Sequence, residues 1–510
     1  MKEANVYFTF SAKSPSCARE TSRGRMWKYI LGGILAPLVS FAQMQDYSWY
    51  FGCGAGLSFK TSPPTPLLNG SFCGSEACAS ISDDTGRILF YSDGDKLFNI
   101  YGDTLANGNG LPTYLSNFGS TNTNGVLILP VPDSDSLFYV FSQNSYVADS
   151  GLWYNVVNPY HNALQGKLLT PKNRRLLQRY TSEKLAAVKH ANGRDWWVLC
   201  HGGFGNFFEF LIRPDSILGP FEYNIGSSDI TGNGQIAEMF FSQNGSKLFK
   251  LSYAGSIDKY DFDRCSGFIS GYRQYGDTGW ALSHRMYYGG SCSPNGNLIY
   301  VSTLNLYMQF DSLWQINISN EAAAVWTLVW ANPFQNLVIG QHQLGPDNKI
   351  YISIGTETGD TMPKTHLKKI SYITNPDSVG LGCGFQFEAL NLNGGLMFLS
   401  LPNSPSYNLG ALPGSPCDTL GLGEPHIENS LRGVSLFPNP NSGRFTLGYF
   451  LPQGSSGKLE VYNLLGEKVY EQELKKNSRE VQINLALAKG IYLCRVVSSN
   501  QSQSIKFMIE

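Results

Sequence analysis

One stretch of the chain gathers groups that could do acid–base or nucleophilic chemistry. In VKHANGRDWWVLCHGGFGNFFEF (188–210), His190, Asp195 and His201 lie within 12 residues of one another, beside Trp196 and Trp197. A histidine next to a carboxylate is the centre of a Ser-His-Asp site, but proximity along the chain across a turn is weak evidence for one. The simpler interpretation places the two tryptophans on opposite faces of a sheet and the histidines at strand ends.

The remaining sequence lacks the usual spacings of catalytic and metal sites. It contains no HExxH, HxH, CxxC or GxSxG motif, so neither a zinc site nor a nucleophile elbow is indicated. We therefore predict no catalytic residue, metal or cofactor. If one face of the protein binds a ligand, aromatic side chains near loops are the best contacts, because they offer a large rigid area with a polar edge. The candidates for such a face are His190, Trp196, Trp197, His201, Trp153 and Trp280.

These groups must be positioned by β-strands. The 510 residues are rich in glycine (54) and aromatics (13%), with only 15% charged residues, a composition that suits strands joined by frequent turns. The net charge is −1, and no basic block is present, so nucleic acid is not an expected partner.

A turn followed by an apolar burst recurs along the chain, as in SPNGNLIYVS (293–302) and SQNGSKLFKLS (242–252). The first apolar residues of the six bursts are spaced by 49, 59, 52, 50 and 52 residues; they are Ile88, Leu137, Trp196, Leu248, Leu298 and Ile350. A period near 50 with several short strands per unit predicts a β-propeller. Residues 43–403 would hold about seven blades, with six or eight as alternatives. We expect the last blade to combine a strand from 46–51 with strands from 385–401.

The composition changes after the ring. Residues 404–433 are rich in Pro, Gly, Ser and Asn and predict a linker. Residues 434–510 contain six or seven short strands and predict a small Ig-like β-sandwich. The predicted fold is thus all-β, a seven-bladed propeller followed by a sandwich.

The tail resembles the type A C-terminal sorting domain of the Bacteroidota type IX secretion system. The resemblance rests on the FPNPNSG start, VYNLLGEKV, the KGIY segment and a lysine in the last strand; the residues are Phe437, Pro438, Asn439, Pro440, Gly443, Gly466, Gly490, Tyr492 and Lys506. It implies export through the secretion translocon and removal of the tail by a sortase-like peptidase. The body would then be released or attached to the cell surface.

The body also resembles a known group. WYFGCGAGLSF, ISDDTGRILFYSDG and SEKLAAVKHANGRDWWVLCH, within about 49–403, are similar to the N-terminal propeller of large Bacteroidota surface proteins. This resemblance supports the architecture, not a particular activity. The same lineage implies O-glycosylation at a three-residue motif. Its first residue is Asp, its second is the modified Ser or Thr, and its third is an aliphatic residue, Met, Ala or Thr. The matches are Thr104, Ser136, Ser216, Ser312, Thr361, Ser378 and Thr419; the alternative is that Asp-Ser and Asp-Thr only form turns.

The N-terminal segment predicts export. Residues 26–42 carry one lysine, an apolar run and small residues before Gln43, the pattern of a signal peptide. Met26 would then be the true start and residues 1–25 a start-site artefact. No other stretch predicts a membrane span. In an oxidising compartment the cysteines can form disulfides; the nearest-neighbour pairs are Cys73–Cys78 and Cys383–Cys417, with Cys494 a buried free thiol.

The sequence favours a secreted or surface-attached binding protein for a glycan, a polymer or another surface protein. An enzyme remains an alternative, because propeller glycosidases and lyases bring carboxylates together at the central channel from different blades. A structural component of a surface or gliding assembly is the third hypothesis.

Overall fold

The structure is a computed structural model and describes residues 44–74, 76–113, 115–116, 119–144, 151–169, 174–202, 205–227, 232–276, 286–303, 311–334, 337–356, 365–418, 432–451, 455–475, 480–498 and 501–510. These residues are almost entirely strands and turns; the helical segments among them, such as α1 (His161–Leu164), span three or four residues. The chain is therefore all-β, as predicted. Residues 1–43, with the predicted signal peptide, lie outside the described part.

Four sheets follow the predicted repeat. Each is an antiparallel meander of four strands in chain order. The strands are β15 (Thr181–Lys189), β16 (Trp196–Gly202), β17 (Phe207–Ile212) and β18 (Ile217–Tyr223); β19 (Met239–Phe241), β20 (Lys247–Leu251), β21 (Ile257–Asp263) and β22 (Phe268–Tyr275); β23 (Tyr287–Cys292), β24 (Leu298–Thr303), β25 (Ser312–Asn317) and β26 (Val325–Ala331); β27 (Leu337–Leu344), β28 (Ile350–Thr356), β29 (Lys369–Ile373) and β30 (Phe385–Asn391).

The N-terminal part is less regular. It contains β1 (Ser48–Phe51), β2 (Ala55–Ser58) and β3 (Thr65–Pro66); β4 (Ala79–Ser82), β5 (Ile88–Ser92), β6 (Lys96–Asn99) and β7 (Thr104–Asn109); a hairpin of β8 (Leu115–Ser116) and β9 (Gly119–Ser120); and β10 (Val126–Pro130), β11 (Phe138–Asn144), β12 (Gly151–Asn158), β13 (Lys167–Leu168) and β14 (Arg174–Arg179). One parallel bridge, Lys167 to Ala106, joins β13 to β7 and merges the β4 and β10 meanders into one sheet.

The recurrent turn and burst have a fixed place in this pattern. Ile88, Trp196, Leu298 and Ile350 each begin the second strand of a meander. The turn before each burst therefore links the first strand to the second. The second strands are buried on both faces, as in β24, where all six residues are buried. The sequence repeat therefore marks the start of the second strand in successive sheets.

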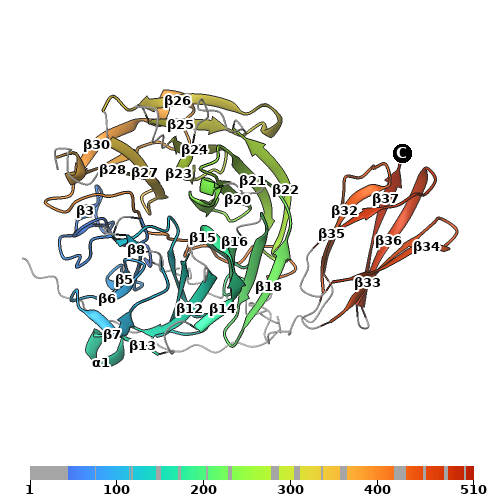
Figure 1. Ribbon diagram of the computed structural model, residues 1–510, viewed down its shortest axis with the longest axis horizontal. Coiled ribbons are helices and arrows are strands. Elements are labelled where there is room, and N and C mark those ends of the chain that lie inside the picture. Colours follow the sequence, from blue (N-terminus) through green and yellow to red (C-terminus); the bar gives the residue numbers. More distant parts are fainter. Residues whose placement is uncertain are drawn as a thin grey trace, which may run out of the picture. The chain divides into compact units, whose positions relative to one another are not determined.

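The sheets pack face to face and close into a ring (Figure 1). Apolar clusters connect each sheet to the next: one joins the β4, β10 and β15 meanders, one the β15 and β19 meanders, one the β19 and β23 meanders, and one the β23 and β27 meanders. A further cluster packs β1 and β2 against the β27 meander and against Tyr91 and Phe98 of the β4 meander. Their first strands contact one another around the centre. This arrangement is that of a β-propeller.

The two ends of the ring meet differently from our expectation. Phe385–Asn391 does not join the strand from 46–51; it forms β30, paired with β29. The strand Ser48–Phe51 pairs with β2 instead. The two ends are still in contact: Cys53 and Leu396 exchange backbone hydrogen bonds of 2.8 and 3.0 Å, and Gly52 N donates to Ser400 Oγ at 3.1 Å.

Residues 401–418, which we call the strap, cross one face of the ring. Most of the strap belongs to the stretch whose composition predicted a linker. Its hydrogen bonds reach several of the meanders: Leu401 N donates to Gln341 Oε1 (2.7 Å), Asn403 Nδ2 to Leu185 O (3.0 Å), Tyr407 Oη to Ile128 O (2.8 Å) and Leu412 N to Ala191 O (2.8 Å).

The described disulfides correct both predicted pairs. Cys53 is bonded to Cys73, and Cys265 is bonded to Cys417 at the end of the strap. Cys78 and Cys383 are buried free thiols. Nearest-neighbour pairing failed because the fold places the chain around a ring, so that residues separated by 152 positions meet while near neighbours diverge. Cys494 is a buried free thiol, as predicted.

The C-terminal part has two sheets around one core. The first contains β31 (Arg432–Phe437), β32 (Arg444–Phe450) and β35 (Glu480–Asn484). The second contains β34 (Lys468–Leu474), β33 (Gly457–Tyr462), β36 (Gly490–Ser498) and β37 (Gln501–Ile509). Side chains from both sheets, including Leu447, Val461, Cys494 and Phe507, form a separate buried cluster.

Candidate functional site

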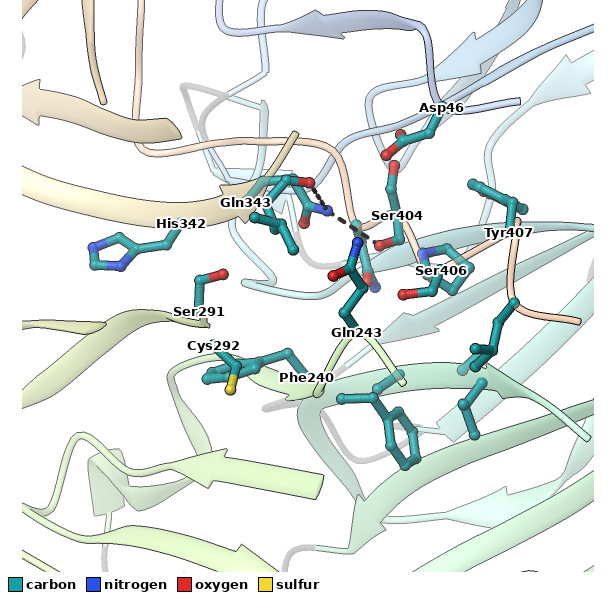
Figure 2. A pocket seen from close by; sticks show the side chains of 18 of the residues that line it. Asp46, Phe240, Gln243, Ser291, Cys292, His342, Gln343, Ser404, Ser406 and Tyr407 are labelled. Atoms are coloured by element: carbon teal, nitrogen blue, oxygen red, sulfur yellow. Dashed lines mark hydrogen bonds between the residues drawn. The ribbon is translucent and has the colours of Figure 1, made fainter. Parts of the chain in front are cut away.

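A cavity of about 460 Å³ lies where the first strands of four consecutive meanders end (Figure 2). It is lined by the last residues of β15, β19, β23 and β27, such as Val188, Phe241, Cys292 and Leu344. The turns that follow contribute Gln243, Asn244, Pro294 and Pro346, and the strap contributes 403–409. The recurrent turn therefore forms part of the cavity rim.

The lining combines uncharged polar groups with apolar side chains. Amides and hydroxyls come from Asn403, Asn408, Gln243, Asn244, Gln343, Ser291, Ser404 and Ser406. Apolar surface comes from Met239, Phe240, Phe241, Tyr407, Leu344 and Leu409. Among the described residues, no lysine or arginine lines the cavity. A few polar groups set in apolar walls are typical of small-molecule sites.

The strap is tied to the cavity wall through Gln343. Its Nε2 donates to Ser404 O at 3.2 Å and to Leu344 O at 3.3 Å. Figure 2 shows these bonds, and it shows the Ser404 side chain directed toward Asp46. Asp46 comes from the start of the ring and Ser404 from its end, so the cavity exists only where both ends meet.

Two carboxyl groups line the cavity, and burial raises the pKa of each. Asp46 accepts a hydrogen bond from Trp49 Nε1 at 2.8 Å, yet burial lifts its pKa to about 7. Glu238 accepts bonds from the backbone N–H groups of Gly290 (2.7 Å) and His342 (3.2 Å), and burial lifts its pKa to about 8. Glu238 thereby holds three adjacent sheets together.

His342 is a lining residue that does not face the polar groups. Its imidazole points away from Gln343 and Ser404 in Figure 2, and burial lowers its pKa to about 3, so the ring is neutral. His342 is 3% exposed, so little of it is accessible from the cavity.

Further acidic groups gather around Tyr288 at the centre of the ring. The charges of Glu76, Glu183 and Glu238 all raise the pKa of the Tyr288 hydroxyl, after the larger effect of burial. Burial, with the nearby charge of Glu183, raises the pKa of Glu76 well above its usual range. Glu183 Oε2 accepts from Thr123 N at 3.0 Å and from Thr123 Oγ1 at 2.6 Å. These residues belong to different meanders, with Glu183 on β15 and Tyr288 on β23.

The residues predicted as a ligand face have structural contacts. Trp196 and Trp197 are each 1% exposed and enter clusters on opposite faces of their sheet, as the simpler interpretation held. His190 Nδ1 accepts from Asn192 N (3.1 Å), while its Nε2 lies 2.9 Å from Cys265 O. His201 is fully buried, 3.5 Å from Lys250 Nζ. None of these four lines the cavity.

The other predicted positions are scattered. Trp153 is half-buried on β12, and Trp280 lies outside the described residues. Of the glycosylation candidates, Thr104 is exposed, and Ser136, Ser216, Ser312 and Ser378 are half-buried; Thr361 and Thr419 fall outside the described part. Within that part, no group of three or more His, Cys, Asp or Glu side chains could hold a metal ion.

The residues of the tail motif form a tight structural unit. β31 ends at Phe437, and Asn439 then binds the backbone of the last strand: its Nδ2 donates to Lys506 O (3.1 Å) and its Oδ1 accepts from Met508 N (2.9 Å). Pro440 follows through a cis peptide bond. The motif therefore connects the first strand of the domain to β37.

The glycines and tyrosine of the motif fix turns around this unit. Gly443 has φ +87°, and a Cβ there would lie 2.3 Å from Leu485 O, so only glycine fits. Gly466 (φ +81°) closes the turn after β33, and Gly490 begins β36. Tyr492 Oη donates to Ala488 O at 2.8 Å.

The family comparison matches the same part of the chain. Residues 435–510 match the model of the secretion system C-terminal sorting domain. The tail is a type IX sorting domain. A sorting domain implies export of the chain to a secreted or cell-surface location and contact with the type IX secretion machinery. No described helix is long and apolar enough to cross a membrane.

The chain is distantly similar to several solved structures. No curated protein matches the chain. The chain is similar to the extracellular domain of a protein described as a one-component system from B. thetaiotaomicron (13% identity, TM-score 0.35), covering 91% of this chain and 55% of that one. It thus spans about half the length of that relative.

Two further solved structures are similar at the same level. One is the β-propeller domain of Cps50 (Swd1) from Myceliophteria thermophila, with 12% identity, TM-score 0.33, and coverage of 61% of this chain and 94% of that one. The other is the periplasmic gluconolactonase PpgL of Pseudomonas aeruginosa, with 11% identity, TM-score 0.32, and coverage of 72% and 90%. Similarity this low carries no information on binding or catalysis.

Sequence reasoning found the sorting motif and missed the cavity. The cavity residues come from seven separate segments, and most of their polar side chains are ordinary Gln, Asn and Ser. The available signal was positional: the second residue of the recurrent turn, Gln243, Pro294 or Pro346, lies at the same end of three successive sheets. Only the ring geometry makes these positions converge.

Proposed function

We propose that the chain is an exported binding protein whose ring captures an extracellular ligand, a glycan, a polymer or a surface protein, at the cavity. The observation that carries this proposal is the polar cavity at the ring centre in a chain that ends in a sorting domain. Small-molecule sites are concave and combine apolar walls with a few convergent polar groups, which describes this cavity.

We also propose a domain organisation for the chain. The ring would have seven blades, with β1–β3 as an incomplete blade between the β27 and β4 meanders and β10–β14 as an irregular one. The tail would be an Ig-like sandwich of type A at 434–510. Residues 26–42 would be the signal peptide and 1–25 a start-site artefact. Within 404–433, the linker would begin only after the strap, beyond residue 418.

The fate of the exported protein follows from the tail. The translocon would recognise the sorting domain, and a sortase-like peptidase would remove it, leaving the ring released or attached to the surface. The exposed Thr104 is the most accessible described candidate for O-glycosylation. If the intact mass of the surface protein equals that of the bare polypeptide, the protein is not O-glycosylated.

An enzyme is the second candidate, and one observation favours it. Glu76, Glu183 and Glu238 come from different sheets and meet around Tyr288, as a propeller glycosidase or lyase would require. However, Glu183 and Glu238 are already bound by backbone N–H groups. Release of reducing sugars from oligosaccharides by the full chain, and its loss in Glu76→Gln, would establish the enzyme.

Two experiments test the proposal. Deleting 434–510 should leave the chain in the periplasm, whereas normal surface display of the truncated chain would contradict export through the sorting domain. The full chain should bind at least one ligand on an array of glycans, polysaccharides and surface proteins. Absence of binding to every class would contradict the binding function.

A further inference from the structure

The cavity has a lining whose charges limit the ligands that fit it. Its described lining includes two acidic residues and no lysine or arginine. Glu238 is 6% exposed and its carboxyl is occupied by two backbone N–H groups. Asp46 lies beside the strap, where its carboxyl accepts a hydrogen bond from Trp49 Nε1 and faces the neutral Ser404 hydroxyl.

We propose that the cavity binds a neutral saccharide of one or two sugar units, an inference that rests on the binding function proposed above. A carboxylate, sulfate or phosphate on the ligand would enter a site with no cation to pair with it, and burying an unpaired charge is costly. The volume of about 460 Å³ lies within the range of about 300–1,000 Å³ typical of small-molecule sites.

The polar groups suit hydroxyls. An amide side chain offers both a donor and an acceptor, and a hydroxyl can do the same, so neutral Asn, Gln and Ser side chains can bond the mixed donors and acceptors of a sugar. Gln243 is exposed at the cavity and Asn408 is exposed on the strap. Asp46, as an acceptor, can receive hydrogen bonds from ligand hydroxyls.

The apolar groups suit the C–H face of a sugar ring. Phe240 and Phe241 line the cavity and are half-buried, so part of each ring remains accessible. Phe240 stacks on Phe249 with the ring centroids 5.3 Å apart, which holds it in place. A fixed aromatic ring beside convergent amides gives a sugar one apolar and one polar contact surface.

Titration calorimetry with the full chain tests the inference. The neutral probes are cellobiose, maltose, mannobiose, lactose and chitobiose, and the acidic comparators, which also have one or two sugar units, are digalacturonic acid and N-acetylneuraminic acid. We expect at least one neutral disaccharide to bind and the acidic comparators to bind at least about tenfold more weakly. Binding of an acidic comparator in preference to every neutral probe would overturn the inference while leaving the binding function intact.

A matched pair of variants locates the site. Gln243→Ala removes an exposed amide at the cavity, and Gln386→Ala removes an exposed amide on β30, which does not line it. Gln243→Ala should weaken the neutral sugar about fivefold or more, and Gln386→Ala should leave it unchanged. Equal effects would overturn the assignment to this cavity. Asn408→Ala provides a second cavity variant, and Gln243→Lys should raise the affinity for digalacturonic acid relative to cellobiose.

Discussion

A disulfide joins Cys265, in the turn between β21 and β22, to Cys417, at the end of the strap. Arg264, the neighbour of Cys265, binds the same region: its guanidinium donates to Gly410 O at 2.6 Å and to Lys189 O at 2.7 Å. The covalent bond and the arginine together hold the strap against the β15 and β19 meanders. Because the strap lines the cavity, this attachment also shapes the candidate site.

Breaking this disulfide should destabilise the ring. Cys265→Ser, Cys417→Ser and the double variant should each lower the free energy of unfolding by about 2–5 kcal/mol, since cross-links that close long loops restrict the unfolded chain. Urea titrations of the three proteins measure the loss. The three losses in the free energy of unfolding should agree, because each change removes the same disulfide. A double variant that loses twice as much as either single variant would show that the two cysteines are not bonded to each other.

The sorting motif predicts a contrast between two glycines. Both Gly443 and Gly466 have positive φ, but a Cβ at Gly443 would lie 2.3 Å from Leu485 O, whereas at Gly466 nothing described lies within 4 Å. Gly466→Ala should cost about 1–2 kcal/mol from backbone strain alone, and Gly443→Ala should cost more. We expect Gly443→Ala to reduce the exported fraction more strongly, measured by immunoblot of the periplasm and medium. Equal export of the two variants would contradict the steric argument.

Because Lys250 and Asp258 form a buried ion pair, we expect the effects of substituting them on the free energy of unfolding to be strongly coupled. Both side chains are fully buried with Nζ and Oδ2 3.1 Å apart. Asp258→Asn should destabilise the chain by about 3–5 kcal/mol, because it leaves a buried ammonium without its counter-charge. Adding Lys250→Met should recover much of the loss in urea titrations.

A surface pair provides the comparison. Lys458 and Glu471 of the sorting domain are 2.9 Å apart, with both side chains exposed. Glu471→Gln should change the free energy of unfolding by less than about 1 kcal/mol. If Asp258→Asn cost no more than Glu471→Gln, the buried pair would not have the role that its position indicates.

The architecture was accessible from the sequence because it depends on local, repeated signals. Each turn of the SPNG or SQNG type followed by an apolar burst specifies the start of a second strand, and the spacing counts the sheets. The sorting motif was equally local, since FPNPNSG and NLLG each form one turn. Such features depend on backbone conformation and neighbouring residues, which the sequence states directly.

The closure of the ring and the cavity were not accessible in this way. Gly, Pro, Ser and Asn between 404 and 418 resemble a flexible linker, yet hydrogen bonds to Ile128 and Ala191 hold this segment on the ring. The partners lie more than 200 residues away along the chain. The disulfide partner of Cys417 and the meeting of Asp46 with Ser404 depend on the same long-range geometry, which no local pattern encodes.

The pH dependence of stability should reveal the buried carboxyl of Glu238. Its pKa is raised from 4.5 to about 8 by burial, so between these values the unfolded chain loses a proton that the folded chain retains. The free energy of unfolding then falls as pH rises through this window, by up to about 1.4 kcal/mol per pH unit for one group, and the loss is complete above pH 8.

Glu238→Gln isolates this contribution. The amide oxygen can still accept from Gly290 N and His342 N, but the side chain no longer titrates. Relative to the wild type, the variant should therefore gain stability steadily from pH 5 to pH 8 in urea titrations and gain nothing further above that. Asp46→Asn should show the same sign over a window that ends near pH 7, where its own pKa lies. A constant difference between wild type and Glu238→Gln across pH 5–8 would show that Glu238 is already ionised in the folded ring.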